Sequence, residues 1–349
     1  MNPAIEIDHV TIMFGTSPEE AINLADKGQS RQEIQAATGN ILGVHDCTLT
    51  VSEGEILVLM GLSGSGKSTL LRGVNRLNPI TSGDIRVWCD GEPRSVAKAG
   101  DAELRKIRSG TISMVFQQFA LLPWRTVAEN VGFGLELAGI DKAGRDNRVA
   151  EQLQLVGLHD RADSLVGELS GGMQQRVGLA RAFATGAPIL LMDEPFSALD
   201  PLIRSRLQDE LLDLQARLKK TILFVSHDLD EALKIGNRIA IMEGGRIVQC
   251  GTAQDILLSP ANGYVADFVA HMNPLGVLCA RDIMRQAAGG EDARKPVAGS
   301  AKPDTPVRQL LAAMAKTRGE IGVIDNGRVV GIIGSDDIVA AIAKYQGQG

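Results

Sequence analysis

A glycine-rich segment is the best candidate in this sequence for phosphate chemistry. Directly after the apolar run 56–60, the chain reads Gly61-Leu62-Ser63-Gly64-Ser65-Gly66-Lys67-Ser68-Thr69. Glycines let successive backbone N–H groups turn toward phosphate oxygens, Lys67 can reach the terminal phosphates, and the Ser68 hydroxyl can ligate Mg2+ at the start of the following helix. A plain Gly/Ser-rich connection is the alternative. The complete G-x-x-x-x-G-K-S spacing after an apolar strand favours a nucleoside triphosphate site.

Four further side chains suit the hydrolysis of a bound triphosphate. Asp193 and Glu194 end an apolar run, where Asp193 can hold Mg2+ and Glu194 can orient or deprotonate the attacking water. His227 follows the next apolar strand, where its imidazole can contact the γ-phosphate and the water. Gln117 also follows a predicted strand, and its neutral amide can touch both Mg2+ and the water. Each residue alone also fits a structural role, so the catalytic interpretation depends on the phosphate segment upstream.

A second set of helix-opening residues suits an anion. Ser170, Gly171 and Gly172 begin a predicted helix that extends to residue 184. The free N–H groups of a helix N-terminus attract anions, although a serine followed by glycines can also serve only as a helix cap. One chain has one phosphate loop, so this second anion site needs a further explanation.

The elements that must position these residues alternate between strand and helix. We predict strands at 5–10, 47–51, 56–60, 111–116, 189–192, 222–225, 239–242 and 247–249. Helices are predicted from residue 126, over 141–154 and over 173–184, and a longer helix carries Leu207, Leu211, Leu214 and Leu218 as a buried stripe. Buried apolar strands separated by helices indicate an α/β fold with a mainly parallel sheet.

An inserted helical hairpin is predicted at about 17–39, between the first two strands. Ser17 and Ser30 each precede a Glu by three residues, as in a capping box, and Gly28 and Gly39 follow the two helical segments.

Composition limits the class of protein. The chain has 349 residues, 44% hydrophobic and 22% charged, with a net charge of −6. This length suggests two or three domains, and the negative charge argues against nucleic acid as a partner. We expect no membrane-spanning segment, no N-terminal signal and a cytosolic location. Cys47, Cys89, Cys250 and Cys279 are widely spaced, which favours free thiols.

The composition changes after Pro274, and residues 289–306 resemble a flexible linker. A helix over 306–316, strands over 321–324 and 329–333, and a helix over 336–343 are then expected to form a small second domain. We therefore predict a main domain at 1–273, a linker or degenerate region at 274–306, and a small unit at 307–349.

The main domain resembles the ABC transporter ATPases over roughly residues 5–270. The resemblance is carried by the phosphate loop 61–69, the Q-loop at Gln117, the signature segment 169–174, the acidic strand end Asp193-Glu194, the D-loop 197–200 and the switch histidine His227. It implies a P-loop NTPase fold with an antiparallel β subdomain and a helical subdomain. ATP and Mg2+ are the implied ligands, with Ser68, Gln117 and Asp193 at the metal and Glu194 assisting hydrolysis.

The resemblance also implies partners. Two copies would form a head-to-tail homodimer in which each ATP contacts Ser170, Gly171, Gly172 and Asp200 of the other subunit, which explains the second anion site. Integral membrane permease subunits would receive the motion through residues 117–130. A separate substrate-binding protein would select the solute, and the chain would lie in the cytoplasm on the inner face of the cell membrane.

The family usually stacks adenine on an aromatic residue near the first strand. Phe14 is the best match in this chain, and a core phenylalanine is the alternative.

Longer segments resemble the ATPases of glycine betaine, proline betaine and choline importers. These segments are 116–123, 198–204 and 226–232, and the insertion at 17–39 is similar to one in that group. We expect transport of a quaternary ammonium compound, with choline first and the betaines next. The C-terminal unit 321–343 resembles one CBS motif, with a dimerisation or packing role as the alternative to ligand binding.

Three other functions are open at this stage. The chain could be a soluble ABC ATPase without a membrane partner, although it has a single set of motifs and no sustained heptads. It could be a nucleotide-binding regulator without turnover, although Glu194 and His227 are both present. It could also serve an importer of another N-methylated solute.

Overall fold

The computed structural model describes residues 2–89, 91–118, 120–197, 199–270, 273–286, 299–317 and 319–346. Phe119, Ala198 and residues 287–298, which belong to predicted segments, lie outside the described residues. The chain divides into two compact units. The first comprises residues 1–228 and 235–248, and the second comprises 229–234 and 249–349.

An antiparallel sheet begins the first unit. Its strands are β1 (Pro3–Phe14), β2 (Ile41–Ser52), β4 (Ser82–Cys89) and β5 (Glu92–Ser95), in the order β2-β1-β4-β5. The two strands predicted around the insertion are confirmed as an antiparallel pair, with Ile5 opposite Val51. Both strands are longer than predicted, because pairing continues through several irregular registers to the base of the insertion.

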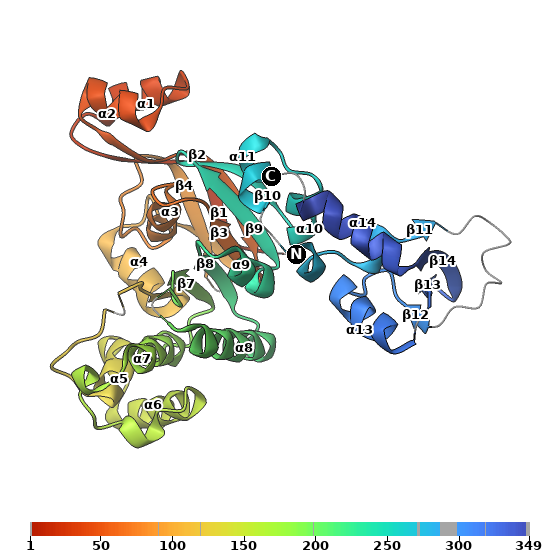
Figure 1. Ribbon diagram of the computed structural model, residues 1–349. Coiled ribbons are helices and arrows are strands. Elements are labelled where there is room, and N and C mark those ends of the chain that lie inside the picture. Colours follow the sequence, from red (N-terminus) through yellow and green to blue (C-terminus); the bar gives the residue numbers. More distant parts are fainter. Residues whose placement is uncertain are drawn as a thin grey trace. The chain divides into compact units, whose positions relative to one another are not determined.

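A six-stranded sheet carries the predicted site. Its strands are β3 (Ile56–Met60), β6 (Ile112–Val115), β7 (Ile189–Asp193), β8 (Thr221–Val225), β9 (Arg238–Glu243) and β10 (Arg246–Gly251). The order is β10-β9-β3-β8-β7-β6, and the pairs from β9 to β6 are parallel. All residues of β3, β7 and β8 are buried, as the uninterrupted apolar runs predict. The helix α3 (Lys67–Val74) contacts both sheets (Figure 1).

The first unit has further helices after β5, and some of them form a small bundle. Their bounds are α4 (Asp101–Lys106), continuing into the π-helical turn Ile107–Thr111, α5 (Val127–Leu137), α6 (Lys142–Leu155), α7 (Gly171–Ala184) and α8 (Pro201–Leu218). α5, α6 and α7 share one apolar core, which makes the predicted helical subdomain. In α8 the predicted stripe is correct for Leu207, Leu211 and Leu214. It is wrong for Leu218, which is 47% exposed because the helix ends there and Lys219 turns into the left-handed region.

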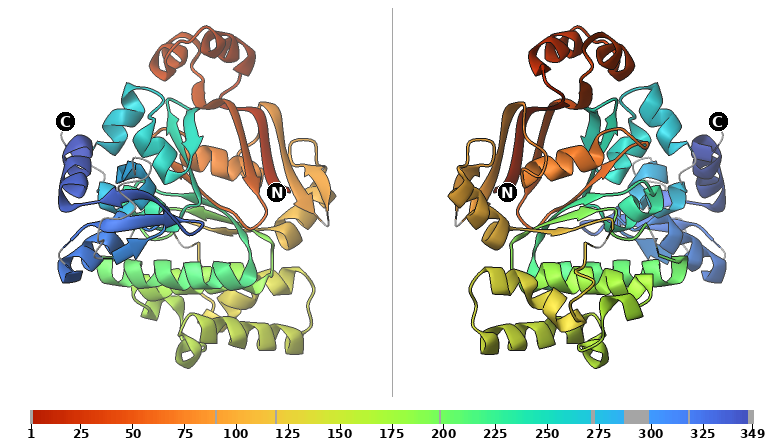
Figure 2. Two further views of the ribbon diagram at one scale, coloured as in Figure 1. Left: turned by 90° about the vertical axis from the view of Figure 1, so that its right-hand side faces the viewer. Right: turned by 90° about the vertical axis from the view of Figure 1, so that its left-hand side faces the viewer.

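The insertion forms two helices, α1 (Pro18–Asp26) and α2 (Arg31–Thr38), at the ends of β1 and β2 (Figure 2). The capping box at Ser30 is confirmed, but the one at Ser17 is wrong because the Ser17 side chain accepts no capping hydrogen bond. Asn40 instead holds the Ser17 backbone, with Oδ1 3.3 Å from the amide nitrogen and Nδ2 3.0 Å from the carbonyl oxygen.

The second unit contains a four-stranded sheet with the order β11-β14-β13-β12. Its strands are β11 (Arg285–Gln286), β12 (Gly299–Ala301), β13 (Ile321–Asp325) and β14 (Arg328–Ile333). Its helices are α9 (Leu229–Ile235, of which residues 229–234 belong to this unit), α10 (Ala253–Leu258), α11 (Gly263–Val269), α12 (Ala280–Ile283), α13 (Val307–Thr317) and α14 (Ser335–Gln346), with a 3-10 turn at Pro274–Gly276.

The predicted linker is wrong at its C-terminal end. Residues 299–301 form a strand that pairs with β13 in parallel. Their small and polar side chains give no strand pattern that could be recognised in the sequence.

Within the described ranges, the chain has no helix whose length and apolar content would let it cross a membrane.

Candidate active site

The phosphate loop joins β3 to α3 in a conformation that needs its glycines. Gly61, Gly64 and Gly66 have φ values of 143°, 78° and 105°, a region that side chains with a Cβ rarely adopt. A Cβ on Gly66 would lie 2.7 Å from the Gly43 carbonyl oxygen, so this position also lacks room. Gly66 begins α3, and the first N–H groups of that helix have no partner within the helix. The loop is therefore built to receive an anion.

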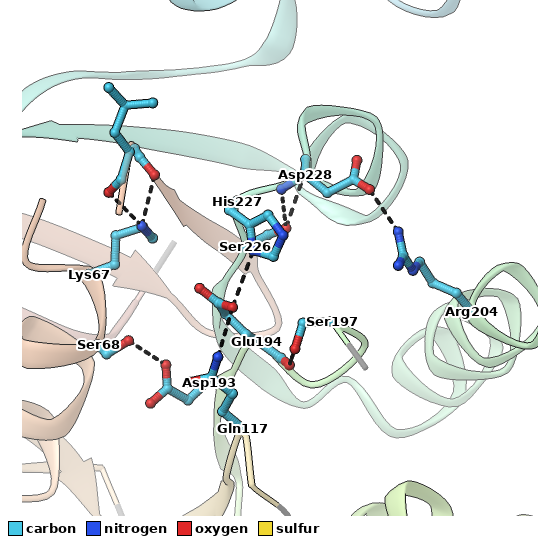
Figure 3. A network of polar contacts seen from close by, with 12 residues as sticks. Lys67, Ser68, Gln117, Asp193, Glu194, Ser197, Arg204, Ser226, His227 and Asp228 are labelled. Carbon is cyan, nitrogen blue, oxygen red and sulfur yellow. Dashed lines mark hydrogen bonds and ion pairs between the residues drawn. The ribbon is translucent and has the colours of Figure 1, made fainter. Parts of the chain in front are cut away.

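Lys67 lies in the loop as predicted. Its ammonium donates to the carbonyl oxygens of Gly61 at 2.8 Å and Leu62 at 3.0 Å (Figure 3). Burial lowers the pKa of Lys67, while the nearby carboxylates of Glu194 and Asp193 act in the opposite direction. A buried ammonium that donates to neutral carbonyl oxygens gains from an arriving anionic phosphate.

Asp193 lies fully buried at the end of β7, opposite the start of α3. Ser68 Oγ donates to Asp193 Oδ1 at 2.7 Å, so the two residues predicted at the metal are adjacent. Arg72 donates to Asp193 Oδ2 through Nε at 3.1 Å and Nη2 at 2.9 Å. The sequence analysis missed Arg72, although its position four residues after Ser68 puts both on one face of α3.

The oxygen donors at this point fit Mg2+. One carboxylate and one hydroxyl, completed by phosphate oxygens and waters, is a common way for proteins to hold this ion at a nucleotide. Among the described residues, no cluster of three or more His, Cys, Asp or Glu side chains offers a separate metal site.

Glu194 is the point at which the three predicted catalytic residues meet (Figure 3). Gln117 Nε2 donates to Glu194 Oε2 at 3.1 Å, and His227 Nδ1 lies 3.2 Å from the same oxygen. Glu194 has a φ of 47°, and its amide nitrogen donates to the Val225 carbonyl oxygen at 3.1 Å. A turn of this kind aims the carboxylate away from the line of β7, toward the residues that follow β6 and β8.

Asp228 anchors the loop that carries His227. Its amide donates to Ser226 Oγ at 2.9 Å, and its carboxylate accepts from Arg204 Nη1 at 3.0 Å. Arg204 Nη2 also donates to the Leu199 carbonyl oxygen at 3.2 Å. Arg204, which the sequence analysis did not select, thus joins the histidine loop to the segment before α8.

Two of the four residues predicted to contact a partner's ATP cap helices. Ser170 Oγ accepts from the Met173 amide at 3.4 Å at the start of α7, and Asp200 Oδ1 accepts from the Ile203 amide at 3.1 Å at the start of α8. Ser170, Gly171 and Asp200 are exposed, and Gly172 is half-buried. Helix capping, the alternative to an anion site, is therefore a real role of both side chains within this chain.

Phe14 ends β1 beside the phosphate loop. A Cβ on Gly43 would meet both the Phe14 ring at 3.0 Å and the Thr69 methyl group at 2.8 Å. The ring is 37% exposed, so Phe14 is not a fully buried core residue. Its predicted contact with adenine stays a prediction.

Asn130 organises the segment between Gln117 and α5. This fully buried side chain accepts from the Leu122 amide at 2.7 Å, and its Nδ2 donates among the carbonyl oxygens of Leu122, Arg125 and Thr126, which lie 3.1, 3.2 and 2.9 Å away. These contacts between one side chain and the backbone hold the segment as a defined loop, with Trp124 at its surface.

Replacement of Asn130 should therefore destabilise the first unit. Asn130→Ala is expected to lower the free energy of unfolding by about 2 kcal/mol, because backbone groups in the loop lose their buried partner. Urea unfolding monitored by fluorescence measures this, since Trp88 and Trp124 both belong to the first unit. Leu137→Ala is the control, because Leu137 lies on the same helix and is 71% exposed. Equal unfolding midpoints for the two variants would contradict the proposed role of Asn130.

Comparisons with known proteins show which families this chain is similar to. The family described as ABC transporter matches residues 44–197, and the family described as CBS domain matches residues 292–344. The glycine betaine/proline betaine transport system ATP-binding protein ProV of Salmonella typhimurium is 47% identical over 98% of this chain and 84% of that protein. The trimethylamine N-oxide transport system ATP-binding protein TmoW of Ruegeria pomeroyi is 45% identical over 95% of both chains.

Solved structures show the same fold. The dimeric, post-hydrolysis ATP-binding cassette MJ0796 with ADP and Pi is 31% identical, with a TM-score of 0.60 over 71% of this chain and 98% of that chain. The P-loop fold, the order of its motifs and the extent of these identities lead to one assignment. This chain belongs to the ATP-binding proteins of ABC transporters, which bind ATP and couple its hydrolysis to transport, and it carries a C-terminal CBS domain.

Proposed function

We propose that this chain energises the import of a small methylated solute with a cationic nitrogen, with glycine betaine and proline betaine first. The observation that carries the proposal is the 47% identity to ProV along nearly the whole chain. Glycine betaine, proline betaine and trimethylamine N-oxide share a fully substituted cationic nitrogen and an anionic oxygen. Choline shares only the nitrogen. The proposal therefore places choline after the betaines, whereas the sequence analysis placed it first, and the comparisons do not confirm that earlier order.

In this proposal Glu194 accepts a proton from the attacking water, while Gln117 and His227 hold the Glu194 carboxylate in place. Lys67 and the first amides of α3 bind the terminal phosphates. Ser68 and Asp193 would hold Mg2+, with Gln117 as the further predicted contact. When bound, Mg2+ neutralises charge that develops on the phosphate oxygens. The 2.7 Å contact between Ser68 and Asp193 supports a metal site at this place.

The working form in this proposal is a homodimer. Ser170, Gly171, Gly172 and Asp200 of each subunit would contact the ATP held by the other subunit's phosphate loop. The dimeric structure of MJ0796 supports this arrangement. The exposure of Ser170 and Asp200, despite their capping roles, leaves their helix ends accessible to a second copy.

A groove lined by α5, α6 and the loop before α5 is the proposed docking site for the membrane permease subunits. Its volume is about 660 Å³, and its lining includes Trp124, Arg125, Glu129, Glu136, Lys142 and Arg145. Trp124 is 73% exposed, and exposed aromatic residues often anchor protein interfaces. The loop that carries Trp124 follows Gln117 in sequence, so a change at the nucleotide could be transmitted to a docked permease. The chain would then lie on the cytoplasmic face of the membrane, and a separate binding protein would select the solute.

Transport assays test the proposal. Cells that lack this chain are complemented with the wild type or with Glu194→Gln, and uptake of labelled glycine betaine, choline and trimethylamine N-oxide is measured. Uptake of glycine betaine restored only by the wild type is the expected result. Restoration of choline uptake alone would reverse the order of substrates. Restoration of none, with ATP hydrolysis intact, would favour an ABC ATPase with another solute or without a membrane partner.

A further inference from the structure

Arg31, the first residue of α2, reaches from the inserted hairpin to the phosphate loop. Its guanidinium donates to the carbonyl oxygens of Gly64 and Gly43, and Nη2 lies 3.4 Å from the Ser65 carbonyl oxygen. One side chain of the insertion therefore contacts two consecutive peptide units of the loop.

These contacts restrict the orientation of the loop amides. In a trans peptide the C=O and N–H groups point in opposite directions. Holding the Gly64 carbonyl orients the Ser65 N–H, which donates to the Leu62 carbonyl oxygen at 3.1 Å and closes the turn. Holding the Ser65 carbonyl directs the Gly66 N–H, which lies at the start of α3, away from Arg31. The Gly245 amide supports the same Ser65 carbonyl at 3.0 Å.

The guanidinium has a tightly fitting seat. A Cβ on Gly245 would lie 2.7 Å from Arg31 Nη2, and a Cβ on Gly66 would lie 3.1 Å from the same atom. Glycines on both sides therefore leave the space that Arg31 occupies, between the phosphate loop and the turn that joins β9 to β10.

The hairpin that carries Arg31 is anchored separately. Ala21, Ala25 and Ile34 are fully buried in a small core of the hairpin with Met13 and Leu42. Arg246 Nη2 donates to the Ala25 carbonyl oxygen at 2.7 Å, and His45 Nε2 lies 3.3 Å from Asp26 Oδ1. These contacts, with the Asn40 bonds to Ser17, make the hairpin a stiff support rather than a loose surface loop.

The charge of Arg31 lacks a counter-charge within the described part of the chain. Its guanidinium is bonded to carbonyl oxygens, no carboxylate pairs with it, and its buried Nε has no hydrogen-bond partner. Burial is also the main cause that lowers the pKa of Arg31. A desolvated cation behind the loop is stabilised when anionic phosphates arrive in front of it.

We propose that Arg31 is a positioning residue that couples the inserted hairpin to the affinity of the phosphate loop for nucleotide phosphates. Because coupling between two sites is reciprocal, anything that shifts the hairpin would change ATP affinity, and bound ATP would stabilise the docked hairpin. This inference rests on the proposed ATP-binding role of the loop.

Titrations of the purified full-length chain with ATP, ADP and adenosine test the inference. Arg31→Ala is expected to weaken ATP and ADP binding by roughly 5- to 20-fold, within the usual range of coupling between sites, and to leave adenosine affinity unchanged. Arg31→Lys, which keeps the charge but loses the fork of donors, should recover part of the loss. At saturating ATP, kcat should fall by a smaller factor than ATP affinity does, because Glu194 and its partners are untouched. Gln32→Ala, an exposed change on the next residue of α2, is the matched control.

The results separate the inference about Arg31 from the proposed function of the chain. If the wild type binds ATP and Arg31→Ala binds it equally well, the inference is overturned and the proposed function stands. If the wild type binds no ATP, both are overturned. Equal weakening of ATP and adenosine would indicate a general loss of structure and would also refute a coupling specific to phosphates. Hydrogen exchange of residues 17–39 with and without ATP gives a second readout, in which slower exchange with ATP is expected only while Arg31 is present.

Discussion

Glu194→Gln is expected to lower ATP turnover by about a hundredfold to ten-thousandfold, while ATP affinity changes by less than about threefold. Glutamine has nearly the shape of glutamate and can still accept the hydrogen bond from Gln117 Nε2, which is 3.1 Å long in the wild type. It cannot accept the proton of the attacking water at neutral pH. The variant should therefore bind ATP and remain in the proposed closed dimer.

Three measurements check this expectation. Phosphate release gives turnover, titration gives ATP affinity, and size-exclusion chromatography with ATP shows whether the dimer accumulates. Glu243→Gln is a matched control, because Glu243 is an exposed carboxylate at the end of the parallel strand β9. Turnover as fast as that of the control would rule out Glu194 as the general base.

Lys67→Ala is expected to act on a different step and to weaken ATP binding by about 30-fold or more. The Lys67 residue is only 6% exposed, and its ammonium donates to the carbonyl oxygens of Gly61 and Leu62. It has already lost most of its hydration, so an incoming phosphate gains a strong electrostatic contact that alanine cannot supply. Titration with ATP measures the loss.

Lys98→Ala provides the control for this variant, since Lys98 is an exposed lysine outside the site. An ATP affinity of Lys67→Ala equal to that of Lys98→Ala would contradict the role of Lys67 at the phosphates. If ATP affinity fell and kcat at saturating ATP also fell, Lys67 would contribute to stabilisation of the transition state as well as to binding.

Features that depend on neighbouring residues could be predicted from the sequence. The phosphate loop, the apolar strand before it and the acidic end of β7 are all encoded in short segments. The capping box at Ser30 likewise depends on two residues three positions apart. Local hydrogen bonds and apolar runs determine these elements, so the order of residues in each short segment was enough to predict them.

Local pattern was misleading where a distant residue competes. Ser17 has the spacing of a capping box, but Asn40 from the far side of the insertion holds its backbone instead. The strand over residues 299–301 has no apolar alternation and forms through pairing with β13. In both cases a tertiary contact outweighs the local preference.

The sequence by itself determined which chemistry this protein carries, because the residue types in its motifs are those that phosphate transfer needs. Only the tertiary structure decided which side chains form hydrogen bonds and ion pairs with one another. Gln117 and His227 meet at Glu194 because β6, β7 and β8 end at the same edge of one sheet. Arg72 pairs with Asp193 because α3 packs against β7, and Arg31 contacts the phosphate loop because the inserted hairpin packs against that loop. Such contacts depend on folding of the whole unit, and no spacing of residues along the chain encodes them.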